Sequence, residues 1–406
     1  MPSPLAPNSR MLIPPVKSVF LFQLSDFCSA FFSGCGASSP EPEKKADFTG
    51  GINILEFGAK GDGITDDTEA IQKAIDLMAK RGGGKIFFPY TKGGYRIAKP
   101  ASEPSRAQLV IPPGTHNIIL EGEMPCRMMN SYMVRQPIPQ LGILKATSFR
   151  MRTDNTRIFS DWDAPEEHDP EARPWSVLGG VEGTLLRGKF SAFMFSIRNL
   201  EIRAKLNTDI MYPTQSAVNL QNISRINIQD CQFCLTNNVG DHESGKHLLP
   251  NPCHTAGLIA SGDQNDNNVL RNVAAQGFRY GFVFGEHVVA DYLYVHNCEQ
   301  AIVFHDCSHL SSIGHVVAQH NQKILASTEC DLFGMPKGPC YVEIGSIDFE
   351  PGGPEYKPEV SNMTHGLWDP ENRLHGSLRY HMGYPVGKDW FPCEGGKFFK
   401  AELFSK

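Results

Sequence analysis

Apolar residues in the second half of the chain fall into short runs that recur at a regular spacing. The clearest four runs start 24, 20 and 22 residues apart, at Gly257, Gly281, Ala301 and Lys323. Runs of this length, bounded by turn-forming residues, are too short for buried helices and favour β-strands. A recurrence of about twenty residues is typical of one coil of a β-solenoid. The alignment places four apolar residues above one another: Ile259, Val283, Val303 and Leu325.

A second set of apolar runs lies between the first, at residues 268–273, 291–295 and 313–317. Polar residues follow these runs and indicate side chains that stack at a turn, namely Gln276, Asn297 and His320. Short runs also occur between residues 190 and 228, whereas residues 123–189 show no clear period. A long segment without pattern in a compact domain is usually either a functional excursion or disordered. We therefore predict one β-helix domain over residues 51–349, with an insertion at about 123–189 that leaves the solenoid.

The stretch from Phe57 to Asp76 has a different pattern, a glycine-rich turn followed by a helix. Its three glycines allow the positive φ of a tight turn, and Asp66 with Glu69 has capping-box spacing. Five apolar residues then fall on one helical face: Ala70, Ile71, Ala74, Ile75 and Met78. Because Gly82 is a signal for the helix end, the pattern predicts a helix over Asp67–Arg81.

This block, FGAKGDGITDDTEAIQKAID, resembles the N-terminal signature of the pectate-lyase-like superfamily of right-handed parallel β-helices. That family includes pectin- and alginate-active enzymes, other glycan hydrolases and lyases, and phage tailspike-type proteins. The resemblance implies an all-β fold, a single-stranded right-handed parallel β-helix whose open end is capped by the helix. It also implies an extended groove suited to a polymer. It does not name the reaction, because in the family the signature caps the solenoid.

The two ends of the chain differ from the repeats. Residues 1–50 contain an apolar stretch, Val19–Phe32, which Asp26 interrupts and which leads to a loose lipoprotein cleavage box ending at Cys35. We predict a leader and tether with lipidation at Cys35, which places the protein outside the cytoplasm, either secreted or lipid-anchored. Membrane contact would then occur only through that anchor. The alternative is an unstructured leader with a chance apolar patch. Residues 350–406 begin with several prolines and glycines and are predicted to form an irregular C-terminal cap.

The composition restricts the classes of partner and cofactor that we expect. The chain has 406 residues and a net charge of −6, with 38 basic and 44 acidic residues and no strong basic block, which argues against nucleic acid. The 11 cysteines show no framework spacing, so we expect them to pack as small apolar side chains. The sequence has no nucleotide-binding, nucleophile-elbow or zinc-protease motif, so we predict neither a cofactor nor a metal. The one exception is calcium, which a lyase would call for. The oligomeric state is left open.

Candidate chemistry lies directly after the stacked strands. In a parallel stack, equivalent residues of successive coils lie about 4.8 Å apart, so acids and imidazoles that follow the strands form rows along one edge. Glycoside hydrolysis needs two carboxylates, and a lyase needs a base next to a neutralised uronate carboxylate. Acids and histidines in solenoid turns are also commonly plain surface residues. The predicted catalytic cluster comprises Glu286, Asp306, Asp263, His287 and His305.

Four further residues are candidates for substrate binding. Arg271 and Arg279, in the neighbouring turn, are candidates for a base or a carboxylate clamp, and the insertion carries Trp162 and Trp175. Together these patterns predict an exported carbohydrate-active enzyme that cleaves a polysaccharide, as a hydrolase or a lyase. The alternative is a non-catalytic β-helix that binds glycan or serves as a cell-surface structural module. Convergence of the acidic rows into a cleft would favour the enzyme.

Overall fold

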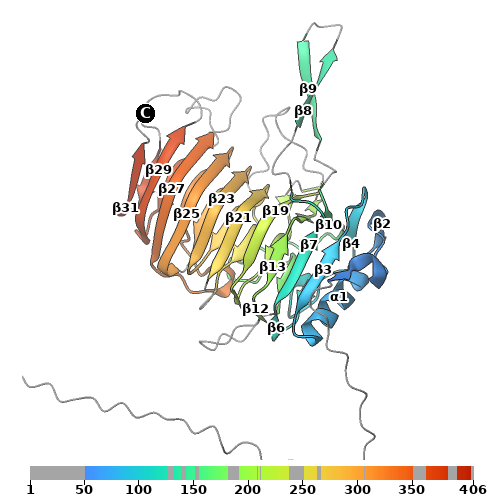
Figure 1. Ribbon diagram of the computed structural model, residues 1–406. Helices are drawn as coiled ribbons and strands as arrows, with labels where there is room; N and C mark the ends of the chain where they lie inside the picture. Colours follow the sequence, from blue (N-terminus) through green and yellow to red (C-terminus); the bar gives the residue numbers. More distant parts are fainter. Residues whose placement is uncertain are drawn as a thin grey trace, which may run out of the picture. The chain divides into compact units, whose positions relative to one another are not determined.

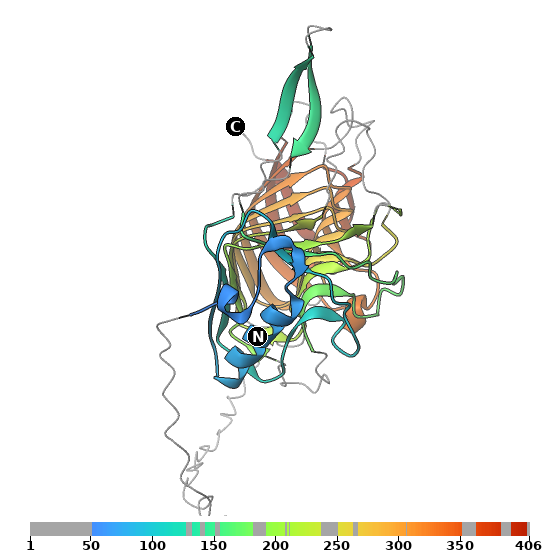
Figure 2. The same ribbon diagram turned by 90° about the vertical axis from the view of Figure 1, so that its right-hand side faces the viewer.

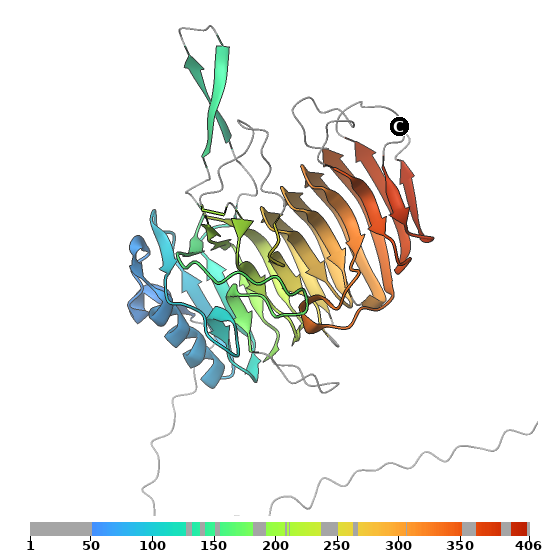
Figure 3. The same ribbon diagram turned by 180° about the vertical axis from the view of Figure 1, so that it is seen from behind.

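The computed structural model shows a right-handed parallel β-helix, as predicted, within a compact unit that spans Asp47–Lys406. Its coils follow one another in chain order (Figures 1 and 3). The structure describes residues 51–126, 132–138, 143–150, 155–181, 192–207, 209–210, 212–236, 251–262, 267–305, 307–350, 363–382 and 391–403. The predicted leader and Cys35 lie outside these ranges. Among the described residues, no helix has the length and apolar character needed to cross a membrane.

The predicted helix is present as α1 (Thr68–Lys80) at the N-terminal end of the stack (Figure 2). It packs against β3 (Gly84–Phe88), β5 (Ala107–Ile111) and the short 3-10 helix η1 (Ile54–Phe57). Its N-cap residue is Asp67, one position later than the predicted capping box. The Asp67 carboxylate accepts hydrogen bonds from the main-chain N–H groups of Lys60 and Gly61, at 2.7 and 3.0 Å. Asp67 therefore anchors the glycine-rich turn to the helix that covers the first coil.

The larger sheet, called the first sheet, has 15 strands. Its main path comprises β1 (Ile52–Asn53), β3 (Gly84–Phe88), β7 (Ile118–Gly122), β13 (Ser196–Arg198), β19 (Asn227–Leu235), β21 (Asn268–Gln276), β23 (Val288–His296), β25 (Cys307–Gln319), β27 (Cys340–Glu350), β29 (Leu374–Met382) and β31 (Phe398–Leu403). Four strands lie off this path: β2 (Asp62–Asp66), β4 (Gly94–Ile97), β10 (Arg157–Ser160) and β14 (Glu201–Ala204).

The second sheet has nine strands, all parallel. They are β5 (Ala107–Ile111), β11 (Ser176–Gly180), β17 (Ser216–Asn219), β20 (Ala256–Ala260), β22 (Tyr280–Phe284), β24 (Gln300–Phe304), β26 (Lys323–Ser327), β28 (His365–Asp369) and β30 (Cys393–Gly395). A small third sheet holds β6 (Thr115–His116), β12 (Ala192–Phe193) and β18 (Ile223–Ser224). Two antiparallel pairs stand apart from these sheets: β8 (Tyr132–Ile138) with β9 (Ile143–Arg150), and β15 (Leu206–Asn207) with β16 (Tyr212–Pro213).

Short polar residues let the chain turn corners between strands. Within the long strands β19 and β21, Asp230 and Asn272 adopt φ values of 52° and 54°. Asn and Asp tolerate this left-handed region better than other non-glycine residues. Asn272 Nδ2 donates to Asp230 Oδ1 at 2.6 Å, which joins the two bends. The predicted turn stack is confirmed for Asn297 and His320, which follow the paired residues His296 and Gln319 and have positive φ, but Gln276 pairs with His296 and lies one position too early.

The predicted strand register is confirmed for three coils and wrong by one residue in the fourth. Ile259 pairs with Val283, and Val283 pairs with Val303, but Val303 pairs with Ala326 instead of Leu325. A shift of one residue moves a side chain to the other face of a sheet. Leu325 pairs with Ile302 and, like it, belongs to the main core, so burial of the larger side chain decides the register.

The stack also takes in parts of the predicted insertion and of the predicted irregular C-terminal cap. Within residues 123–189, β10 pairs with β4 and β14, and β11 pairs with β5 and β17, so both strands belong to the stack. Beyond residue 350, β28 to β31 continue both sheets as far as Leu403. Both corrections have one cause: proline, glycine and charge interrupt the apolar period before short strands resume it.

The outward face of the second sheet is covered by two loops. Leu332, Phe333 and Met335, in and around the short 3-10 helix η3 (Leu332–Gly334), pack on a second apolar cluster that includes Val283, Val303 and Ala326. The main-chain N–H of Phe333 donates to the carbonyl of Pro170 at 2.7 Å, in the loop between β10 and β11. Residues far apart in the chain therefore meet over this sheet.

Candidate functional site

Two of the five predicted catalytic residues lie together in one described turn. Glu286 and His287 connect β22 to β23, and the structure adds His309, from β25 in the next coil. His309 Nδ1 contacts Glu286 Oε1, and the rings of His287 and His309 stack with centroids 4.6 Å apart at an angle of 5°. Asp263 and Asp306 lie outside the described residues. The catalytic role of the predicted rows therefore stays a prediction.

His305 lies in the interior of the protein, with 0% of its surface exposed. Its Nε2 accepts a hydrogen bond from the main-chain N–H of Leu332 at 2.9 Å, and its carbonyl accepts one from buried Arg373. Burial, with a contribution from the charge of Arg373, lowers the pKa of His305 to about 4. His305 is therefore placed to hold the covering loop against β24. A side chain this deeply buried does not contact a polymer.

Acid should therefore weaken the fold partly through His305. Its pKa is about 4 when folded and 6.5 unperturbed, so below about pH 6.5 only the unfolded chain takes up this proton. His305→Gln, which keeps an acceptor for Leu332, is expected to reduce the loss of unfolding free energy between pH 6.5 and 4, by at most about 1.4 kcal/mol per pH unit. Urea unfolding followed across this range measures the slope. Equal slopes for both proteins would contradict the assignment.

The two predicted arginines do not meet at the Glu286 turn. Arg271 is exposed on β21 and lies 3.5 Å from Asp291 on the next coil. Arg279 directly precedes β22, whereas Glu286 follows it, so they lie at opposite ends of that strand. Arg279 donates to His254 Nε2 at 3.1 Å and lies 3.4 Å from Glu299. Arg279 therefore belongs to a separate polar cluster at the other edge of the second sheet.

The two tryptophans form a contact with each other in the loop between β10 and β11. The rings of Trp162 and Trp175 meet edge to face with centroids 5.5 Å apart. The Arg106 guanidinium lies 4.9 Å from the Trp175 ring, a cation–π distance. Trp162 directly follows Asp161, which lines a cleft on the first sheet. Its backbone thus lies next to that cleft, while part of its ring surface is used by Trp175.

A cleft of about 210 Å³ opens beside β10 and β14, at the edge where the strands of the first sheet end. Alternate residues of a strand share a face, so Arg157 and Phe159 from β10 lie beside Arg203 from β14. Lys205 and Thr236, which follow β14 and β19, complete this wall. The cleft is lined by Gly93, Arg157, Phe159, Ser160, Asp161, Arg203, Lys205 and Thr236.

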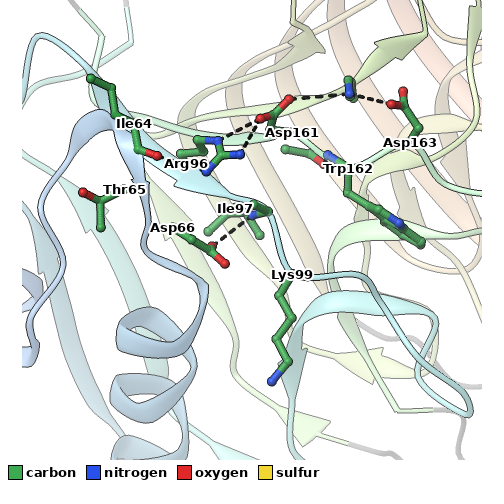
Figure 4. Close-up of polar contacts among 12 residues, drawn as sticks. Ile64, Thr65, Asp66, Arg96, Ile97, Lys99, Asp161, Trp162 and Asp163 are labelled. Carbon is green, nitrogen blue, oxygen red and sulfur yellow. Dashed lines mark hydrogen bonds and ion pairs between the residues drawn. The ribbon is translucent and has the colours of Figure 1, made fainter.

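Ion pairs fix the rim of the cleft (Figure 4). Arg96 Nη2 lies 2.6 Å from Asp161 Oδ2, and Lys205 Nζ lies 2.6 Å from Asp163 and 3.5 Å from Asp161. Burial opposes ionisation of Asp161, but hydrogen bonds and the charges of Arg96 and Lys205 outweigh it and lower its pKa. Asp161 is therefore a firmly ionised counter-ion, and a weak proton acceptor.

The floor of the cleft contains two neighbouring guanidinium groups. Arg203 is paired with Glu201, a carboxylate only 1% exposed that also accepts from Asn155 Nδ2 at 2.8 Å. Arg157 donates to the carbonyls of Lys92 and Gly93, at 2.7 and 2.9 Å. Burial, together with the charge of Arg203, lowers the pKa of Arg157. An anion bound beside Arg157 would offset this electrostatic cost.

The sequence pattern does not predict the residues that line the cleft. Arg157 and Asp161 fall in the aperiodic segment, and Arg203 and Lys205 lie more than forty residues further along the chain. The sequence holds one signal: each of these arginines lies next to an apolar residue in a short strand-like run, RIFS at 157–160 and EIRA at 201–204. Only the pairing of β10 with β14 shows that these two arginines are neighbours.

Comparison with known proteins gives a family match for the first coils. Residues 51–162 match the family described as "Rhamnogalacturonase A/epimerase, pectate lyase-like". Alginate lyase 7 of Azotobacter vinelandii is 51% identical over 59 residues, which is 14% of this chain and 6% of that protein. Mannuronan C5-epimerase AlgE2 of the same organism is 45% identical over 64 residues, 16% of this chain and 6% of its own. Thus the chain matches only a small part of these relatives.

Among solved structures, ORF18 of Geobacillus virus E2 aligns with 88% of this chain and 62% of its own, at 14% identity and a TM-score of 0.43. The resemblance to the pectate-lyase-like superfamily is confirmed by the family match and by the relatives found from the sequence.

Proposed function

We propose that this pectate-lyase-like β-helix protein is a carbohydrate-active enzyme that binds an anionic, uronate-containing polysaccharide in the cleft beside β10 and β14. The observation that supports this most directly is the charge of the cleft. Arg157, Arg203 and Lys205 line it, in a chain whose net charge is −6. Guanidinium groups match carboxylates in geometry as well as in charge.

The charges in the cleft favour one class of reaction. Removal of a proton next to a uronate carboxylate needs that carboxylate to be neutralised, and we assign this role to Arg157 and Arg203, which line the cleft. Glycoside hydrolysis needs a carboxylic acid with a raised pKa. Of the described carboxyl groups that line the cleft, Asp161 has a lowered pKa. We therefore favour lyase or C5-epimerase chemistry, in line with what the relatives are named for, over hydrolysis.

A panel of polysaccharides tests this proposal. Purified protein is expected to bind alginate or pectate and not a neutral glucan, because the cleft supplies cations. Binding is expected to weaken as salt rises from about 0.01 to about 1 M, over which the Debye length falls from about 30 to about 3 Å. Affinity electrophoresis measures binding, and absorbance of unsaturated uronate with a reducing-end assay measures cleavage. Equal affinity for neutral and acidic polymers would sink the proposal, and binding without any turnover would favour the non-catalytic alternative.

A further inference from the structure

We propose that Glu286, His287 and His309 form a binding site for a divalent transition-metal ion such as Zn²⁺, separate from the polysaccharide cleft. One ligand atom of each side chain can be chosen so that all three lie within 4.8 Å of one another. Glu286 Oε1 contacts His309 Nδ1 and lies 3.9 Å from His287 Nδ1. Both imidazoles therefore face the same carboxylate oxygen.

The fold holds these three residues in place. Glu286 and His287 occupy the tight turn before β23, and His309 lies near the start of the neighbouring strand β25. Ser311 Oγ links the two coils, because it accepts from the main-chain N–H of Val288 at 3.1 Å and donates to the carbonyl of Gly285 at 3.4 Å. The Glu286 side chain is only 13% exposed, whereas those of His287 and His309 are 40% and 59% exposed. A fixed carboxylate thus lies beneath two imidazoles that remain open to solvent.

The ligand set selects the class of metal. Two imidazoles and one carboxylate, with a fourth position open to water, match three-ligand zinc sites, in which metal–nitrogen bonds are about 2.0–2.1 Å. Imidazole favours zinc, nickel and copper, whereas calcium takes six to eight oxygen ligands. The site is therefore distinct in chemistry from the calcium that a lyase would call for.

The site is also distinct in position from the cleft. Arg203 and Thr236 mark the ends of β14 and β19, whereas Glu286 precedes the start of β23. Since the strands are parallel, these are opposite edges of the first sheet. An ion bound at Glu286 would thus leave the cleft cations unchanged.

The chain supplies a matched control. His381 Nδ1 lies 3.2 Å from Asp348 on the surface, with both side chains 45% exposed, so it reproduces an imidazole–carboxylate pair without the second histidine. If a pair were enough to bind metal, His381→Ala would weaken binding as much as His309→Ala.

Isothermal titration of the full, EDTA-treated chain with ZnCl₂ tests the proposal. The comparison is between variants, so that any zinc bound elsewhere on the chain contributes equally to each titration. His287→Ala and His309→Ala are each expected to weaken one binding event by about tenfold or more, as loss of a ligand requires, and Glu286→Gln to do the same. His381→Ala is expected to leave it unchanged.

Zinc anomalous scattering from soaked crystals gives a second measurement that does not depend on the variants. A peak between Glu286 and the two imidazoles is expected. Unchanged titrations for both histidine variants, or a peak only elsewhere, would overturn the site. Circular dichroism of each variant separates lost binding from lost folding.

Discussion

Arg157→Gln is expected to weaken binding of a uronate polymer by about tenfold or more. A hydrogen bond to a charged group contributes roughly 1.5–3 kcal/mol, and 1.4 kcal/mol corresponds to a tenfold change in affinity. The glutamine keeps a donor near the carbonyls of Lys92 and Gly93, which Arg157 now contacts at 2.7 and 2.9 Å. Affinity electrophoresis against alginate or pectate measures the change, and any turnover should fall in parallel.

Arg271→Gln is the matched control for that experiment. It removes the same charge from the same sheet, but Arg271 is exposed on β21 and lies near Asp291, away from the cleft. Its effect on affinity is expected to be within about twofold, since a single exposed ion pair contributes little. If both variants lost affinity equally, the effect would be one of overall charge, and the cleft assignment would fail.

Phe284→Ala is expected to destabilise the protein by roughly 3–5 kcal/mol. Phe284 is fully buried in the main core, stacked on Phe282 at a centroid distance of 5.5 Å and lying 5.9 Å from Phe304 in the next coil. Its removal leaves a cavity that neighbouring coils cannot close, because their main chains are hydrogen-bonded at a fixed spacing. Denaturant unfolding followed by circular dichroism gives the change in unfolding free energy.

Val289→Ala is the control for the core substitution. Val289 is 49% exposed on β23, so its truncation is expected to change the unfolding free energy by less than about 0.5 kcal/mol. A similar loss for both variants would show that the Phe284 effect does not come from the core.

The sequence predicts the coils well because each coil repeats the same local chemistry. Strands β21 and β23 are each flanked by residues with positive φ, and apolar positions recur at about one coil along the stack. Where two neighbouring residues are both apolar, as Leu325 and Ala326 are, the pattern cannot say which one faces the core. Packing decides which residue faces the core, and as a result Ala326 pairs with Val303.

The candidate sites are less predictable because they depend on pairing between coils of unequal length. The strand register brings Arg157 to Glu201, next to Arg203, although strands β11, β12 and β13 lie between them in the chain. The sequence pattern does not predict the position of His309, for a similar reason. β25 begins earlier than its apolar run, so His309 lies beside the Glu286 turn while its sequence neighbours suggest a loop.

The covering loops of the second sheet bear on how the protein unfolds. In a plain solenoid each coil touches only its neighbours, so the ends can fray while the middle persists. Here two hydrogen bonds connect the loop after β26 to the region of β11 and β17. One is the Phe333–Pro170 bond, and in the other Gln221 Nε2 donates to the Phe333 carbonyl at 3.0 Å. Strands β20, β22 and β24 lie between these points in the sheet. Separation of any one of these strands would strain the two hydrogen bonds, so we expect the central coils to unfold together as one cooperative unit.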